Sequence, residues 1–345
     1  MATPEQRAHQ RDIIADLCVS PDFDAQLEVE RRSDFLANYL QSTGMRTLVL
    51  GISGGVDSLV GGCLAQRAVE RCRARGYEAS FIAMRLPYGE QRDESDAQLS
   101  LSVIQPDETL VVDIKPASDA MLQSVLSAGL AFRDEAQQDF VHGNVKARQR
   151  MIAQFAVAGA RQGLVVGTDH AAEALMGFFT KYGDGAADIT PLTGLNKRRV
   201  RALAQLMGAP PEQVNKVPTA DLESLSPLKP DEVALGVSYD DIDDFLEGKV
   251  VSDTAYEVIF STYRRTAHKR ALPVFPAFGG GARPRRRRVA RRTFCRHAKT
   301  PPAGGVVYFA PANAGGYHWL TCATDAACPS CWRAAWGIQP WAVRR

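Results

Sequence analysis

The sequence predicts an α/β fold in which a doubly wound, mainly parallel sheet carries helices on both faces. Two observations point to this class. Short apolar runs alternate with helical patterns over residues 47–168, which is the order of βαβ units. The first run, 47–52, has no polar alternation, which is typical of a strand buried on both faces. Ligands bind beyond the carboxyl ends of such strands, so the segments after each run are where we look for a site.

The elements follow in order along the chain. Apolar residues recur at helical spacing through residues 5–42, before the first strand. The strand at 47–52 leads through a glycine-rich segment into a helical pattern over 59–75. Further strands are expected at 79–86, 109–114 and 163–168, with helices at 93–104, 116–129 and 144–162.

Composition excludes several classes of protein. The chain has 345 residues, of which 45% are hydrophobic and 23% charged, so it is neither a disordered chain nor a fibre. No apolar stretch approaches the roughly 20 residues of a membrane span, and the N-terminus lacks the apolar core of a signal peptide. We therefore expect a cytoplasmic protein without a membrane partner.

Charge divides the chain into two parts. Residues 1–275 carry a net charge of −9, whereas 276–345 carry +11, with seven arginines in 283–292 and four of the seven cysteines. We predict one domain over 1–275 and a disordered basic tail over 276–345. Alternatives for the tail are a nucleic-acid-binding arm, a zinc module around Cys328 and Cys331, and an out-of-frame extension. The abrupt reversal of charge favours an appendage that binds polyanions weakly at most.

A glycine-rich loop follows the first strand. Glycine lets main-chain N–H groups approach phosphate oxygens, and a helix N-terminus favours anions. Asp57 suits such a site only if a cation accompanies the phosphates, so we expect it to bind Mg²⁺. The loop is neither a Walker A loop nor a G-x-G-x-x-G motif. The predicted phosphate-binding residues are Gly51, Ile52, Ser53, Gly54, Gly55, Val56, Asp57 and Ser58.

Two other interpretations of this loop remain open. One is a glycine-rich turn whose Asp and Ser only cap a helix. The other is the G-x-S-x-G nucleophile elbow of an α/β-hydrolase, with Ser53 as nucleophile and Asp188 and His268 as formal partners. The elbow leaves Asp57 and Ser58 without a role.

A second segment, Gly167 to Glu173, also follows an apolar run and begins a helix. Glu173 is therefore expected at the same sheet edge as Asp57, where two carboxylates and phosphate oxygens would suit Mg²⁺. An acid in the first turn of a helix is the simpler explanation for Glu173 alone. His170 is expected to be a structural hydrogen-bonding residue.

The SGGVDS loop resembles the pyrophosphate-binding loop of the ATP pyrophosphatase superfamily. Further segments make residues 5–275 similar to ammonia-dependent NAD synthetases, which implies an adenine nucleotide alpha hydrolase-like fold. These segments are RLPYGEQRDESDAQL (85–99), GNVKARQRMIAQ (143–154), GTDHAAEALMGFFTKYGDGAADITPLTGLNKR (167–198), KVPTADL (216–222), SYDDIDDFLEGK (238–249) and AHKRALPVF (267–275). Asn196 stands where threonine is common and should still cap a helix.

The resemblance assigns roles to individual residues. Beyond the loop, the residues implied to bind ATP are Arg85, Gln91, Thr168, Lys197 and Thr219. Those implied to bind deamido-NAD are Arg148, Lys181, Asp188, His268 and Lys269. Asp57 and Glu173 match the magnesium ligands, Lys197 would stabilise the departing pyrophosphate, and Asp184 is a candidate to handle ammonium.

The implied reaction joins ammonia to the nicotinate carboxylate of deamido-NAD after ATP has adenylated that carboxylate. Only 50 residues precede the loop, too few for a glutamine amidase domain, so ammonia is the expected nitrogen donor. The resemblance also implies a homodimer. Another ATP pyrophosphatase ligase, and a nucleic-acid-binding protein that uses the arginine-rich tail, remain as alternatives.

Overall fold

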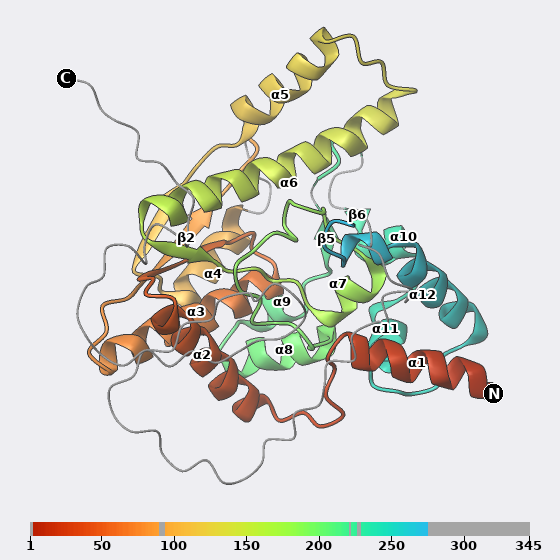
Figure 1. Ribbon diagram of the computed structural model, residues 1–345, viewed down its shortest axis with the longest axis horizontal. Helices are drawn as coiled ribbons and strands as arrows, with labels where there is room; N and C mark the ends of the chain where they lie inside the picture. The colour runs from red at the N-terminus through yellow and green to blue at the C-terminus, as the bar shows by residue number, and fades with distance from the viewer. Residues whose placement is uncertain (1–2, 90–93, 221, 226–228, 275–345) are drawn as a thin grey trace, which may run out of the picture. The chain divides into compact units, whose positions relative to one another are not determined.

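The described residues contain a parallel sheet with strand order β3-β2-β1-β4. Figure 1 labels its strand β2, below α6. Its strands are β1 (Thr47–Gly51), β2 (Ser80–Arg85), β3 (Glu108–Val111) and β4 (Gly163–Val165). Val49 of β1 is in register with Ile82 of β2 and with Val165 of β4. The chain thus builds β1, β2 and β3 outward in one direction and then returns to place β4 on the other side of β1, which makes the β1–β4 edge a topological switch point.

The computed structural model describes residues 3–89, 94–220, 222–225 and 229–274. Gln91 and the tail at 276–345 lie outside these residues, so the predictions made for them stay predictions. No helix within the described part is both long and apolar enough to cross a membrane.

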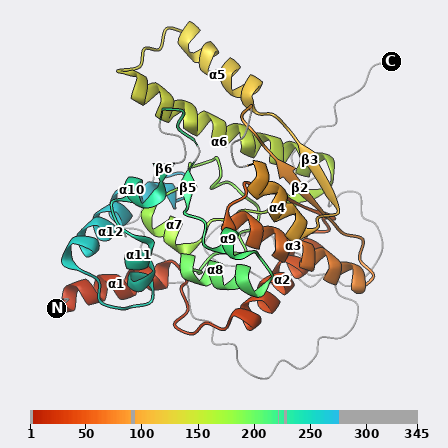
Figure 2. The same cartoon turned by 180° about the vertical axis from the view of Figure 1, so that it is seen from behind.

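Helices cover both faces of the sheet, as Figures 1 and 2 show from opposite sides. Leu48, Leu50 and Phe81 point to one face and belong to a core whose helices include α2 (Ala25–Ser42), α3 (Val56–Ala74) and α8 (Lys197–Leu206). The alternate residues Val49 and Ile82 belong to a second core with α6 (Glu135–Ala160) on the other face. The predicted doubly wound α/β fold is confirmed.

A third hydrophobic core joins four helices: α1 (Pro4–Asp16), α7 (Ala171–Met176), α11 (Tyr239–Leu246) and α12 (Asp253–Arg265). Leu175 and Phe245 are its fully buried centre. This core fixes α7 and α11 beside the carboxyl end of β1. The remaining elements are α4 (Glu94–Ile104), α5 (Lys115–Ser127), α9 (Pro211–Val214), α10 (Asp231–Leu235), β5 (Thr219–Ala220), β6 (Lys229–Pro230) and η1 (Ala267–Lys269).

Three expectations about elements need correction. The helical stretch predicted over 5–42 is two helices, because Cys18 adopts a positive φ of 58° after α1 and Asp24 caps a new helix by accepting a hydrogen bond from the Leu27 N–H. Helix α6 begins at Glu135, nine residues before the expected start at 144, with Asp134 as its cap. Strand β3 ends at Val111, and as an edge strand it is only partly buried.

Candidate active site

The glycine-rich loop turns the chain from β1 into α3. Gly54 has a φ of +86°, and a Cβ atom there would lie 2.8 Å from the backbone nitrogen of Ala97 in α4. Glycine is therefore required at this position for both backbone conformation and space. Gly55 is the N-cap of α3 and has no side chain to satisfy the N–H groups of the first turn. Those donors face the cavity described below and suit phosphate oxygens.

Asp57 in the first turn of α3 forms an ion pair with Lys197 in the first turn of α8. The distance between Asp57 Oδ2 and Lys197 Nζ is 2.7 Å, and the Lys197 side chain is only 3% exposed. Residues 140 positions apart in the sequence thus form a buried charge-assisted hydrogen bond beside the phosphate loop. Such a pair is costly to break, because either partner alone would leave a buried charge.

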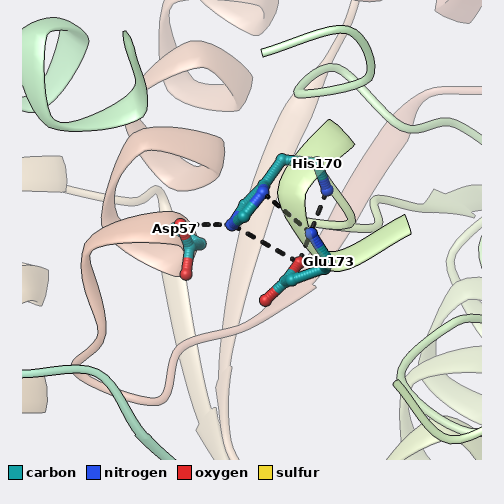
Figure 3. Close-up of side chains that lie close together, drawn as sticks. All are labelled: Asp57, His170 and Glu173. Atoms are coloured by element: carbon teal, nitrogen blue, oxygen red, sulfur yellow. Dashed lines mark hydrogen bonds and ion pairs between the residues drawn. The ribbon is translucent and has the colours of Figure 1, made fainter. Parts of the chain in front are cut away.

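His170 and Glu173 of α7 face Asp57, as Figure 3 shows. His170 Nε2 lies 3.4 Å from Asp57 Oδ1 and 3.6 Å from Glu173 Oε2. His170 is also the N-cap of α7: its Nδ1 accepts from the Glu173 N–H, and Glu173 Oε2 accepts from the His170 N–H. An accepting Nδ1 places the proton of the neutral ring on Nε2, so His170 points a donor at the two carboxylates. This agrees with its expected structural role.

Burial and neighbouring charges shift the pKa values in this cluster. Burial alone would raise the pKa of Asp57, but Lys197 and His170 outweigh it and hold that pKa below its usual range. Burial also opposes the charge of Lys197, yet Asp57 and Glu173 raise the Lys197 pKa. Burial and then the charge of Asp57 raise the pKa of Glu173. The cluster therefore holds a firm Asp57–Lys197 pair and a second carboxyl that a cation would ionise.

A cavity of about 490 Å³ opens at the carboxyl ends of β1 and β4, between the phosphate loop, α6, α7 and residues 216–219 and 222–223. This is the switch point of the sheet, where ligands are expected. The predicted site residues in its wall are Gly51, Ile52, Ser53, Gly55, Val56, Asp57, Ser58, Thr168, Glu173, Asp184, Lys197, Thr219 and Lys269. Most of the residues that the sequence predicts for the site thus line one cavity.

Comparison with known proteins decides the family. A family model described as NAD synthase matches residues 28–273, more than half of the chain. The chain belongs to the NAD synthase family. It is 64% identical over 273 residues to a Burkholderia cenocepacia protein named NH(3)-dependent NAD(+) synthetase, and the match covers 79% of this chain and 97% of that protein. A protein of the same name from Streptomyces coelicolor is 64% identical over 276 residues, covering 80% of this chain and all of that one.

Solved structures place the fold in the same family. The NAD+ synthetase from Burkholderia pseudomallei is 59% identical, with a TM-score of 0.69, and matches 79% of this chain and all of that chain. An NMN synthetase from Francisella tularensis is 35% identical, with a TM-score of 0.65, and matches 74% of this chain and all of that chain. The phosphate loop and the α7 carboxylate therefore belong to an NAD synthase scaffold.

Arg85 and Gly54 are predicted ATP-binding residues of this NAD synthase chain that do not line the cavity. Arg85 is 1% exposed, and its guanidinium donates to both carboxylate oxygens of Glu94, at 2.7 and 2.6 Å. Gly54 lies under the start of α4. Arg85 thus stabilises the beginning of α4 next to the phosphate loop, and its contact with ATP stays a prediction.

The residues predicted for deamido-NAD separate into two groups. Lys269 lines the cavity, and its Nζ donates to the carbonyl oxygens of Gly177 and Phe179. Outside the wall, Lys181 Nζ donates to the His268 carbonyl at 2.6 Å, and Arg148 donates to the Lys181 carbonyl at 3.2 Å. The three cationic residues thus come from different parts of the chain: Arg148 from α6, Lys181 from the turn after α7 and Lys269 from η1.

Asp188 is held by the sheet. Its carboxylate accepts from the Val165 N–H at 2.8 Å, and its own N–H donates to the Val165 carbonyl at 2.9 Å. The α/β-hydrolase interpretation finds no support: within the described residues, no hydrogen bond joins Ser53, Asp188 and His268. The Ser53 hydroxyl instead lies 3.2 Å from Ser58 Oγ and accepts from the Gly55 N–H.

Sequence reasoning missed several acidic and aromatic groups near the site. Burial, followed by the charges of Asp184 and Asp57, raises the pKa of Asp169 to about 7. Asp231 lines the cavity, and Tyr239 and Asp243 of α11 contact Lys197. The available signal was the segment SYDDIDDFLEGK, which matched the family but had no role assigned to it. A run of acidic residues is typical of a solvated helix face. The sequence pattern therefore does not show that one of them, Asp243, is buried.

Proposed function

We propose that this protein is an NH3-dependent NAD+ synthetase, a ligase that uses ATP and ammonia to convert deamido-NAD into NAD, AMP and pyrophosphate. The observation that carries the proposal is the Asp57–Lys197 pair, which lies beside Glu173 at the phosphate loop of a cavity large enough for nucleotides. Its identity of 64% to two proteins of that name supports the assignment of substrates.

The first step forms an adenylate. An oxygen of the nicotinate carboxylate attacks the α-phosphorus of ATP, and pyrophosphate leaves with the electron pair of the broken P–O bond. The N–H groups of the phosphate loop and the Lys197 ammonium stabilise the charge that accumulates on pyrophosphate. Asp57 holds Lys197 at the cavity wall before ATP arrives, so little reorganisation is needed during the reaction.

The second step forms the amide. Ammonia attacks the adenylated carbonyl carbon, and AMP leaves with the oxygen that had belonged to the carboxylate. The attacking nitrogen loses a proton to a nearby base, and Asp184 in the cavity wall is our candidate for handling ammonium. No covalent bond to the enzyme is required, so holding the substrates in line supplies much of the acceleration.

Asp57 and Glu173 fit a magnesium ion. Asp57 Oδ1 is buried and, among the described residues, makes no well-formed hydrogen bond, although His170 Nε2 lies 3.4 Å from it. The ligand atoms of Asp57, His170 and Glu173 lie within 4.8 Å of one another. Two carboxylates that leave room for phosphate oxygens and water suit Mg²⁺, whereas the Nε2–H of His170 makes it a poor ligand. Bound there, the ion would neutralise phosphate charge and polarise the α-phosphate.

Arg148, Lys181, Asp188, His268 and Lys269 are the proposed deamido-NAD residues. Arg148, Lys181 and Lys269 are cationic; Lys269 lines the cavity, and Arg148 and Lys181 lie outside its wall, where each donates a hydrogen bond to a main-chain carbonyl. Phe179 of the same region lines the cavity and offers a ring for stacking. The dinucleotide would thus lie across the cavity with its carboxylate toward ATP.

We propose a homodimer and a cytoplasmic location. Apolar side chains are exposed along the α5–α6 hairpin, which includes Ile152 and Phe155 at 52% and 37% exposure. Such residues are more typical of an interface than of a free surface. The three cysteines within the described residues are free thiols, as is usual in a reducing compartment.

The experiment that tests the function measures NAD formation by the purified full chain with ATP, Mg²⁺, ammonium and deamido-NAD. A parallel reaction replaces deamido-NAD with nicotinate mononucleotide, because an NMN synthetase is a structural relative. We expect NAD to form in the first reaction. The Lys197→Ala variant should lose most of this activity. Preference for the mononucleotide, or ammonium-dependent activity that survives Lys197→Ala, would contradict the proposal.

A further inference from the structure

The backbone of Lys197 is held by an acidic side chain from another helix. Asp243 of α11 accepts hydrogen bonds from the N–H groups of Lys197 at 3.0 Å and Arg198 at 2.7 Å. The N-cap Asn196 accepts from the next N–H, that of Arg199. The first three N–H groups of α8 are thus bound by two side chains, where a helix would otherwise leave them to water.

Asp243 occupies a special place in the acidic segment of α11. It is 2% exposed, whereas the Asp240 side chain is 88% exposed at the surface. Asp244 pairs with the side chains of Arg198 and Lys249 rather than with the backbone of α8. A carboxylate at a helix N-terminus also interacts favourably with the helix dipole. Asp243 therefore fixes where α8 begins, and with it the origin of the Lys197 side chain.

Tyr239 contacts the other end of the same lysine. It lies four residues before Asp243, so both side chains project from one face of α11. Lys197 Nζ is 5.2 Å from the centre of the Tyr239 ring, within the range of a cation–π interaction. The Tyr239 hydroxyl donates to Asp231 Oδ2 at 3.1 Å, which restricts the ring. Helix α11 thus holds Lys197 by its main chain and by its ammonium group.

We propose that Asp243 and Tyr239 are positioning residues for Lys197, which hold its ammonium where the phosphates of ATP bind. This inference rests on the proposed function, in which Lys197 stabilises the departing pyrophosphate. A buried lysine has a long flexible stem, so its charge is useful only if both the backbone and the head group are fixed. Displacement of a reacting group by about 1 Å can cost about a hundredfold in rate.

The test compares Asp243→Ala and Asp243→Asn with Asp240→Ala and Asp240→Asn, which make the same changes at an exposed position of the same helix. The readouts are ATP–pyrophosphate exchange with deamido-NAD, which reports adenylation, and ATP affinity by calorimetry, each normalised to folded protein. We expect Asp243→Ala to lower the exchange rate about tenfold or more and Asp243→Asn to lower it less, since one acceptor oxygen remains. Both Asp240 variants should match the wild type.

The role of the Tyr239 ring is tested by comparing two substitutions at this position. Tyr239→Phe keeps the ring and should retain most of the exchange rate, whereas Tyr239→Leu removes the ring and should lower it severalfold. Equal losses in the two variants would mean that the hydroxyl, or packing in general, matters rather than the ring against Lys197.

A double-mutant comparison separates positioning from a merely structural role. If Asp243 acts through Lys197, Asp243→Ala should weaken ATP binding in the wild type but have little further effect in a Lys197→Ala background. Additive losses, or an Asp243→Ala protein as active per folded molecule as Asp240→Ala, would overturn the inference and leave the proposed function intact. A wild-type protein that neither binds ATP nor catalyses exchange would overturn both.

Discussion

At the scale of single residues, the site is built from ionisable side chains that are largely buried away from water. The Asp57–Lys197 bond of 2.7 Å is buried, and Glu173 and Asp169 lie close enough for their pKa values to be raised by burial and by neighbouring carboxylates. Burial and neighbouring carboxylates therefore disfavour the ionised forms of Glu173 and Asp169. A divalent cation that arrives with a nucleotide would stabilise the ionised forms, which fits the place of this cluster beside a phosphate loop.

The first prediction concerns the two carboxylates. Asp57→Asn and Glu173→Gln should each lower pyrophosphate exchange by about a hundredfold or more and weaken the apparent affinity for Mg²⁺, because each removes an anionic ligand. Exchange rates measured over a titration of Mg²⁺ at fixed ATP check this. Glu223→Gln, another acid in the cavity wall, is the matched control and should change the Mg²⁺ dependence little. Near-normal exchange at low Mg²⁺ in either variant would show that the two residues do not share an ion.

The second prediction concerns pH and stability at Asp243. Burial, only partly offset by its hydrogen bonds to Arg198 and Lys197, raises the pKa of Asp243 from 3.8 to about 6. Because the folded pKa is the higher one, the folded state binds the proton more tightly. The stability that Asp243 contributes is therefore complete below pH 3.8 and is lost as pH rises toward 6. Asp243→Asn lacks this loss, so its stability relative to wild type should rise by up to about 3 kcal/mol between pH 4 and 6.5.

Urea unfolding of the two proteins across this pH range measures that difference. Asp240→Asn on the exposed face of α11 controls for a general change in net charge. A stability difference between Asp243→Asn and wild type that stays constant with pH would mean that the Asp243 carboxyl is not desolvated as the structure indicates.

At the scale of elements, the phosphate loop depends on α4 as well as on its own glycines. Gly54 combines a φ of +86° with a backbone nitrogen 2.8 Å from where its Cβ would be, and that nitrogen belongs to Ala97 of α4. Gly76, at the end of α3, has a similar φ of +78° but open space around it. The two positions therefore separate the strain of a left-handed conformation from the effect of steric contact.

The third prediction uses this pair. Gly76→Ala should cost about 1–2 kcal/mol of stability, from backbone strain alone, and leave pyrophosphate exchange unchanged. Gly54→Ala should cost at least as much stability and also lower exchange at least tenfold, because the loop or α4 must move away from the phosphates. Chemical unfolding and exchange assays on both variants check this. Equal exchange in the two variants would show that α4 does not hold the loop in its active conformation.

Much of the fold at this scale could be predicted from local pattern. The buried run 47–52, the glycine loop and the helix after it follow from short-range chemistry, and most of the predicted residues around the cavity come from loops after such strands. The break at Cys18 and the early start of α6 could not be predicted from the apolar pattern. The first depends on the positive φ of one residue, and the second depends on the cap formed by Asp134. The roles of Asp243 and Tyr239 depend on the packing of α11 against α8, which no local pattern contains.

At the scale of the whole molecule, the α5–α6 hairpin offers the surface for the proposed dimer. The fourth prediction is that Ile152→Asp converts the protein to a monomer in sedimentation experiments, because the introduced charge cannot be buried at an apolar interface. Leu27→Asp changes an apolar residue on α2 that is 63% exposed, at the opposite face of the sheet, and should leave the dimer intact. Dimers that persist in Ile152→Asp would place the interface on another surface.

The central claim, that ATP activates the nicotinate carboxylate for attack by ammonia, is tested most directly by following oxygen. Deamido-NAD labelled with ¹⁸O in its carboxylate is converted by the purified enzyme with ATP, Mg²⁺ and ammonium, and the products are analysed by mass spectrometry. The account predicts one ¹⁸O atom in AMP, none in pyrophosphate, and NAD that retains the other carboxylate oxygen in its amide. Unlabelled AMP, or ¹⁸O in pyrophosphate, would contradict it.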